Sequence, residues 1–218
     1  MKIYDISRLI HPSIAVWPGD TSFERTETLR IEDGDSVNLS SARLSLHTGT
    51  HADAPWHFTR EGASIDQVDL ARFWGRARVV TVHAWPAIQE AHVQPFLKSG
   101  MRRLLVRANP EIQDNNFVED FVYFEPEAAR SIAASGVLLI GIDGPSVDAF
   151  GSKELGAHHA FGKENVAILE NLDLRHVPDG DYELVALPLR IFRGDGSPVR
   201  AVLRELAPEQ TRIRELEN

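Results

Sequence analysis

The chain contains no cysteine, which excludes disulfide bonds, thiolate metal ligands and cysteine nucleophiles. No apolar run approaches the roughly 18 residues of a membrane span, and the first residues lack the long apolar segment of a signal peptide. Acidic residues outnumber basic ones by 32 to 23, and the formal net charge of −9 argues against a surface that follows nucleic-acid phosphates. Together these absences predict a cytoplasmic protein that binds neither membranes nor nucleic acids.

What is present is ordinary for a globular protein. Apolar residues make up 43% of the chain and charged residues 25%. The length of 218 residues suits one domain, and no internal repeat, low-complexity tract or interdomain linker interrupts the sequence. We therefore predict a single domain that spans residues 1–218.

Strand-like segments outnumber helical ones. About eight short stretches rich in valine, leucine and isoleucine predict strands, at 2–10, 36–48, 76–84, 102–108, 136–143, 166–172, 182–189 and 198–206. Helix signals occur at 126–135, at 64–75, and as a short helix interrupted by a proline within 86–100. This mixture predicts an α+β (mixed α/β) fold with a strand-rich core and a few helices, rather than an all-β sandwich or a doubly wound sheet.

One short segment, LHTGTHADAPWHF, concentrates three of the nine histidines and an aspartate: His47, His51, Asp53 and His57. On a straight strand His47 and His57 would lie ~33 Å apart at ~3.3 Å per residue, so the backbone must bend before both can reach one site. Gly49 and Pro55 permit or enforce such bends. Two histidines and a carboxylate form a usual ligand set for a catalytic divalent metal, and without thiolates zinc or manganese is the expected ion. The alternative is that these side chains only cap turns and satisfy backbone groups.

A second group of polar residues lies more than a hundred positions later. His158 and His159 are adjacent, and Glu170 stands within the apolar segment VAILENL. A buried carboxylate is costly without compensation, so Glu170 should have a cationic partner or bind metal, unless it faces solvent at a strand end. At least one of the two histidines is expected to be a surface or packing residue.

The segment HTGTHADAPWHF resembles the HxGTHxDxPxHF signature of the metal-dependent cyclase-like hydrolases. Further motifs of that family follow the same order along nearly the whole chain: YDIS, AVWPGDT, LIGIDGPSVD, SKELGAHHA, AILENL, YELVALPL and GSPVRAVLR. Within the family the chain is similar in particular to bacterial arylformamidases. The resemblance implies a swivelling β/β/α-type fold, a homodimer, and hydrolysis of a small aryl formamide such as N-formyl-L-kynurenine, which yields kynurenine and formate in tryptophan degradation.

The resemblance also implies two divalent metal ions per chain, with zinc expected and manganese as the alternative. His47, His51 and Asp53 would bind the first ion. Asp53 would bridge to the second ion, which His158 would also bind, and Glu170 would span both. His158 is chosen over its neighbour because the family's ligand histidine precedes the glutamate by twelve residues, as His158 precedes Glu170.

The same resemblance implies two roles outside the metal ligands. His57 would be the general acid and base, since an aniline leaving group must be protonated as the C–N bond breaks. Trp17 would line the pocket for the aromatic ring of the substrate. Asp143 and Ser146 are candidates only for contacts behind the ligands. Gly144 stands where the family often has threonine, and we expect it to remove a side chain from a pocket wall.

Two alternatives stay open at this point. A sibling hydrolase with the same ligands could open a cyclic amide or lactone such as isatin, and only the pocket wall would distinguish it. A non-enzymatic metal-binding protein could keep the fold without activity. A storage or scaffold role gives no reason for a fourth, non-ligating histidine such as His57 beside the ligands, which favours an enzyme.

Overall fold

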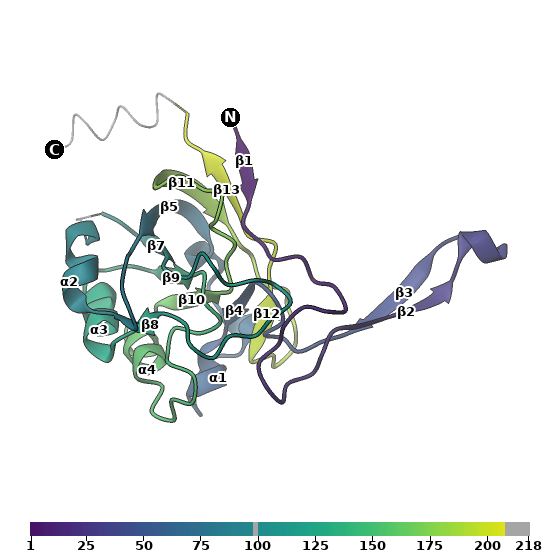
Figure 1. Ribbon diagram of the computed structural model, residues 1–218, viewed down its shortest axis with the longest axis horizontal. Helices are drawn as coiled ribbons and strands as arrows, with labels where there is room; N and C mark the ends of the chain where they lie inside the picture. The colour runs from purple at the N-terminus through teal and green to yellow at the C-terminus, as the bar shows by residue number, and fades with distance from the viewer. Residues whose placement is uncertain (98–99, 208–218) are drawn as a thin grey trace.

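The computed structural model describes residues 1–97 and 100–207, and its centre is one mixed nine-stranded sheet (Figure 1). The strand order is β1-β13-β11-β5-β7-β9-β10-β4-β12. The bounds are Ile3–Asp5 (β1), His51–Asp53 (β4), Trp74–Thr81 (β5), Arg103–Arg107 (β7), Leu139–Ile142 (β9), Ala167–Glu170 (β10), Gly180–Val185 (β11), Gly196–Pro198 (β12) and Val202–Glu205 (β13). The order brings the N-terminal strand beside the last strand, and β4 beside β10 and β12.

The middle of the sheet is parallel and buried on both faces. Strands β5, β7, β9 and β10 pair in parallel, and the strands that flank them pair antiparallel. Along β7, Leu104 and Val106 point into one apolar cluster, whereas Leu105 between them points into the other. Such two-sided burial explains the nearly continuous apolar runs of these segments.

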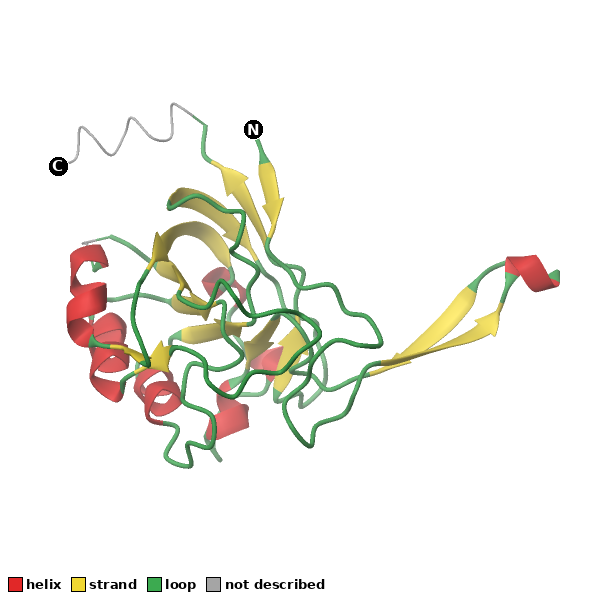
Figure 2. Cartoon of the chain, in the orientation of Figure 1, coloured by secondary structure: helices red, strands yellow, loops and turns green. Residues whose placement is uncertain are grey.

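Helices cover one face of this sheet (Figure 2). They are α2 (Glu90–Val93), α3 (Pro126–Ala134) and α4 (Gly156–Lys163), and the short α1 (Pro55–Phe58) lies against α4. The prediction of a helix at 126–135 is confirmed, and Ala128, Ala129, Ile132 and Ala133 are its buried residues. A small parallel pair, β6 (Ala87–Ile88) and β8 (Tyr123–Phe124), adjoins these helices. The α+β class is therefore confirmed. Across the described ranges, no helix has the length and apolar character needed to cross a membrane.

One helix prediction needs correction. Residues 64–75 form two 3₁₀ turns, Ile65–Gln67 (η2) and Leu70–Arg72 (η3), instead of one helix. The reason is that Asp69 caps the second turn by accepting from the Ala71 amide, and Gly75 already belongs to β5. The short helix interrupted by a proline within 86–100 is confirmed, because α2 ends at Val93 and a 3₁₀ turn that contains Pro95, Gln94–Phe96 (η4), follows it. Residues 98–99 lie outside the described ranges.

Helix α4 is absent from the sequence-based prediction. It contains two glycines, which lower the intrinsic helix propensity of so short a segment. One of them, Gly162, lies so close to α1 that an added Cβ would stand 2.5 Å from the Phe58 ring. The helix is thus stabilised by close packing rather than by local propensity.

A two-stranded arm projects away from the sheet (Figure 1). It consists of β2 (Glu24–Leu29), a 3₁₀ turn at Ile31–Asp33 (η1), and β3 (Leu39–Arg43). The strand predicted at 36–48 therefore ends at Arg43, after which the chain enters the loop that leads to β4.

Candidate functional site

The histidine-rich segment folds back on itself in the way that the expected bend requires. Gly49 adopts a φ of +64°, which is favourable for glycine, and turns the chain between His47 and β4. His47 Nδ1 then lies 3.0 Å from Asp53 Oδ1, and His51 Nε2 lies 3.4 Å from the same oxygen. Pro55 follows as the first residue of α1, which carries His57.

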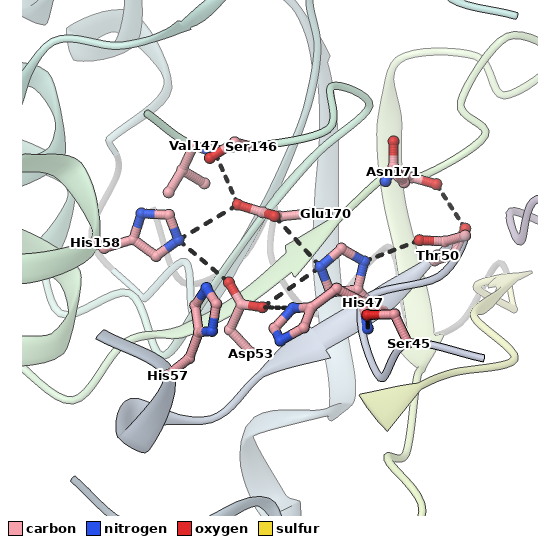
Figure 3. Close-up of polar contacts among 12 residues, drawn as sticks. Ser45, His47, Thr50, Asp53, His57, Ser146, Val147, His158, Glu170 and Asn171 are labelled. Atoms are coloured by element: carbon pink, nitrogen blue, oxygen red, sulfur yellow. Dashed lines mark hydrogen bonds and ion pairs between the residues drawn. The ribbon is translucent and has the colours of Figure 1, made fainter. Parts of the chain in front are cut away.

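The distant residues reach the same place through strand pairing and through α4. Glu170 is the direct partner of His51 in the antiparallel pairing of β10 with β4, so both side chains leave the same face of the sheet. Glu170 Oε2 lies 3.3 Å from His51 Nε2. His158, on α4, places Nε2 3.3 Å from Asp53 Oδ2 and 3.6 Å from Glu170 Oε1 (Figure 3). The structure thus brings all five predicted ligands together.

These side chains form two triads that share one aspartate. Ligand atoms of His47, His51 and Asp53 lie within 4.8 Å of one another, and so do those of Asp53, His158 and Glu170. We call these five residues the floor of the site. The exposed His159 is in neither triad.

The floor has the polar atoms that a metal ion would need. His51 Nε2 and both carboxylate oxygens of Asp53 are buried without a hydrogen-bond partner, although His51 Nε2 lies at ion-pair distance from Asp53 Oδ1, and His158 Nε2 from Asp53 Oδ2. Buried polar atoms rarely lack a hydrogen-bond partner unless an ion or another bound group interacts with them. Imidazole and carboxylate donors suit zinc and manganese. The residues therefore fit a metal cofactor.

The electrostatics of the floor point the same way. Burial lowers the pKa of His51, but the carboxylates of Asp53 and Glu170 more than offset this and raise it to about 10. Burial likewise lowers the pKa of His158, and Asp148 and Asp53 raise it to about 10. Protons on these imidazoles supply positive charge that the buried carboxylates require, and a divalent cation could supply the same charge while binding the nitrogens.

One carboxylate behind the floor, Asp148, is missing from the sequence-based prediction. Its Oδ2 lies 2.6 Å from His158 Nδ1, and it also accepts from the amides of Ala157 and His158 at the start of α4. This arrangement leaves His158 Nε2 directed at the floor, as in a carboxylate–histidine–metal contact. The sequence signal for it was its place at the end of the family motif LIGIDGPSVD, shortly after strand β9.

The two residues predicted for such contacts have other partners. Asp143 accepts from the backbone amides of Ala108 and Asn109 and so anchors the loop that follows β7. Ser146 lines the cavity, and its hydroxyl accepts from the Asp148 amide at 3.2 Å. The expectation that Gly144 removes a side chain from the pocket wall was wrong. A Cβ at this position would point toward Asn109 and stand 2.8 Å from its Nδ2, not toward the cavity.

His57 lies at the edge of the floor rather than within it. Its ring centroid is 4.2 Å from that of His47 and 6.0 Å from that of His158, and 36% of its side chain is exposed. Burial of the remainder lowers the pKa of His57 below its ordinary value. A half-exposed, predominantly neutral imidazole at this position can accept a proton.

A cavity of about 450 Å³ is lined both by floor residues and by aromatic side chains. The floor residues that line it are His47, His51, His158 and Glu170, and the aromatic ones are Trp17 and Phe117. The Trp17 ring packs 5.3 Å from Phe117 and 5.1 Å from Phe150. Neither phenylalanine was predicted, because both stand in loops whose sequence has no periodic pattern.

Comparison with known proteins places this site in a described family. Residues 4–149 match the family Cyclase, described as "Putative cyclase". A kynurenine formamidase of Salinibacter ruber (strain DSM 13855 / M31) is 45% identical over 212 residues, which cover 96% of this chain and 100% of that protein.

Solved structures resemble the fold as a whole. One, of a potential metal-dependent hydrolase with cyclase activity, has a TM-score of 0.81 and 26% identity, and covers 94% of this chain and 99% of that one. An isatin hydrolase bound to the product analogue thioisatinate has a TM-score of 0.80 at 20% identity, and covers 93% of this chain and 91% of that one. The second likeness bears on the fold alone.

Proposed function

The chain belongs to the Cyclase family and is related over nearly its whole length to the kynurenine formamidases, and we propose that it hydrolyses N-formyl-L-kynurenine to L-kynurenine and formate. The observation that carries this proposal is the floor of histidines and carboxylates, in which buried polar atoms lack hydrogen-bond partners. Floor residues and the aromatic Trp17 and Phe117 line one cavity. The protein is thus a hydrolase that acts on a small molecule and uses a metal cofactor.

We propose two divalent ions per chain, with zinc as the expected metal. His47, His51 and Asp53 would hold one, and His158 and Glu170 would hold the other together with Asp53. Metal ions bound by such residues lower the pKa of water from about 15.7 toward about 7 and polarise an amide carbonyl. The sharing of Asp53 by the two triads supports a paired rather than a single ion.

His57 is proposed to move the protons of the reaction. It lines the cavity beside the floor, so its ring can take a proton from the attacking water and return it to the aniline nitrogen. This return is needed because an aniline anion is a poor leaving group. The partly exposed position of His57 also lets it exchange protons with solvent between turnovers.

Trp17 is proposed to hold the aryl ring of the substrate. Its indole is edge-on to Phe117 and tilted toward Phe150, and these contacts fix its orientation at the cavity wall. Trp17 and the floor residues line the same cavity, so an aryl ring at Trp17 and its formamide group at the floor would occupy one binding site.

A single experiment addresses both function and metal. Purified protein is dialysed against a chelator, reloaded with zinc or manganese, and assayed with N-formylkynurenine by the absorbance of kynurenine, with elemental analysis of each sample. We expect close to two ions per chain in the active sample and loss of turnover on chelation, because water that is not activated is a poor nucleophile at neutral pH. Full activity in a metal-free sample would refute the mechanism.

The isatin-hydrolysing alternative rests on a likeness of fold alone. Isatin is offered to the same metal-loaded preparation in parallel. Turnover of isatin without turnover of N-formylkynurenine would transfer the assignment to a cyclic-amide hydrolase with the same ligands.

The projecting arm supports a homodimer. Residues 24–43 are exposed except for Leu29, and the exposed set includes the apolar Ile31, Val37 and Leu39. A two-stranded ribbon with no packing partner is marginally stable in water, so we propose that a second copy of the chain covers the arm.

The oligomeric state can be tested at the arm. Light scattering should give twice the chain mass for the wild type and a shift toward the monomer for the double variant Val37→Lys, Leu39→Lys. Leu70→Lys, which changes an exposed leucine outside the arm, is the control and should stay dimeric. A monomeric wild type would refute the proposal. The cytoplasmic location, the absence of nucleic-acid binding and the extent of the single domain remain predictions.

A further inference from the structure

The turn Gly194–Asp195–Gly196 has no role in the function described so far, although it adjoins the floor. Gly196 begins β12 and pairs with Asp53 of β4. The carbonyl of Asp195 accepts from the Ala54 amide at 2.9 Å. The backbone of this turn is therefore fixed beside the segment that carries three of the proposed metal ligands.

The carboxylate of Asp195 lies against two imidazoles. Its Oδ2 is 3.2 Å from His47 Nε2, within hydrogen-bond distance, and 3.9 Å from His57 Nδ1. The glycine that follows makes this approach possible, since a Cβ at Gly196 would stand 2.9 Å from His47 Cε1. The turn is thus shaped to receive the His47 ring.

The orientation of His47 shows what this contact does. Its Nδ1 faces Asp53 Oδ1 at 3.0 Å, while its Nε2 faces Asp195. A carboxylate beside Nε2 favours the tautomer with the proton on Nε2, which leaves the lone pair of Nδ1 directed at the floor.

His47 and His57 line the cavity, but Asp195 does not. The two imidazoles lie against each other with an interplanar angle of 40°, so a group that fixes one ring limits the other. Contact with the substrate is therefore not what this carboxylate provides.

We propose that Asp195 is a positioning residue that holds the rings of His47 and His57, and thereby sets both the affinity of the floor for divalent metal and the rate of turnover. The direct hydrogen bond goes to His47, and the negative charge beside Nδ1 of His57 orients that ring. The part that concerns His57 rests on the proposed function, whereas the part that concerns His47 rests on the geometry of the floor.

The test uses Asp195→Ala and Asp195→Asn in the full chain, with zinc as the probe. Zinc affinity is measured by competition with a chromogenic chelator, and kcat and KM for N-formylkynurenine are measured at saturating zinc. For Asp195→Ala we expect zinc affinity to fall about 10- to 100-fold, with the wild-type number of ions still bound at saturation. We also expect kcat to fall by about tenfold or more with KM within about twofold, because a misoriented proton-transfer group affects the chemical step.

Asp195→Asn keeps an acceptor for His47 Nε2–H but removes the charge. Relative to Asp195→Ala, it should recover most of the zinc affinity, because the hydrogen bond to His47 is kept. It should recover less of kcat, because the negative charge beside His57 is lost.

Asp66→Ala is the matched control. Asp66 Oδ1 accepts from the Arg193 amide at 3.1 Å and so anchors the same loop without touching either imidazole. It should keep wild-type zinc affinity and kcat, and circular dichroism should show all three variants folded. The same losses in Asp66→Ala would mean that loop anchoring, not ring positioning, is responsible.

Other results would also overturn the proposal. Wild-type affinity and kcat in Asp195→Ala would remove Asp195 from the machinery, and loss of one whole ion at saturating zinc would make it a ligand. If the wild type does not hydrolyse N-formylkynurenine, the proposed function fails, but the zinc affinities still decide whether Asp195 positions His47.

Discussion

The floor of the site and its rim, which we define as His57 at the edge of the floor, differ in how much of their side chains is exposed to water. Four of the five floor side chains, those of His51, Asp53, His158 and Glu170, are at most 5% exposed, and that of His47 is 18% exposed. The side chain of His57 at the rim is 36% exposed. Buried charged groups are costly unless they are compensated, and removing one partner from a buried ion pair typically costs about 3–5 kcal/mol. The floor is therefore a set of mutually dependent charges, while His57 at the rim can act more independently.

This difference separates two kinds of task. Groups in the floor keep a fixed arrangement of donors ready for a cation, because neither water nor large side-chain motion can replace their contacts. The rim remains in reach of solvent and substrate, which proton transfer and substrate exchange require. Substitutions in the floor should therefore lower metal content and turnover together, whereas substitutions at the rim or in the cavity wall should lower turnover or raise KM with little change in metal content.

The largest effect is expected for Glu170→Gln in the floor. The amide keeps the shape of the side chain and one oxygen that can accept from the Val147 amide, but it removes the negative charge opposite His51. We expect a folded protein with at least one metal site weakened and turnover nearly abolished. Elemental analysis and the kynurenine assay on the same sample provide the measurement.

Glu170→Ala should be similar in activity, with a further loss of stability from the cavity that it leaves. Glu164→Gln, an exposed glutamate at the end of α4, is the control and should behave as wild type. Wild-type metal content and wild-type turnover in Glu170→Gln would remove Glu170 from the site and the floor from the mechanism.

A smaller and more selective effect is expected for His57→Ala at the rim. The variant should retain most of its metal, because His57 is not needed to complete either floor triad. It should lose a factor on the order of 10² to 10⁴ in kcat, the range typical of lost general acid–base catalysis. The metal content and kcat of His57→Ala are compared with those of His51→Ala.

His159→Ala, which changes the exposed histidine beside His158, should leave both quantities unchanged. A His57→Ala protein that loses metal as completely as His51→Ala would show that His57 is a ligand. The triad of His47, His57 and Asp195 would then be the group to consider for that ion.

The smallest effect is expected for Trp17→Ala in the cavity wall. Stacking between aromatic rings contributes about 0.5–1.5 kcal/mol beyond the area buried, so KM should rise roughly 2- to 10-fold with little change in metal content. Trp74→Ala, an exposed tryptophan in β5, is the control and should leave KM unchanged. An unaltered KM in Trp17→Ala would place the aryl ring elsewhere in the cavity.

Much of the chemistry could be inferred from the sequence because it is local. His47, His51, Asp53 and His57 stand within eleven positions, Gly49 supplies the bend, and the order of motifs indicates the family. The α+β class also follows from local patterns, since apolar runs and the Pro126 helix start express the periods of strands and helices.

The tertiary structure alone decided how the distant residues meet. Glu170 faces His51 only because β10 pairs with β4 in one register, and a shift by one residue would turn its side chain to the other face. Helix α4 forms through packing against α1 despite its glycines, and it directs His158 inward and His159 outward. Asp148 and Asp195 reach their histidines through a loop and a turn that no periodic pattern describes. Strand register and packing between distant segments are properties of the whole chain, so a local pattern cannot specify them.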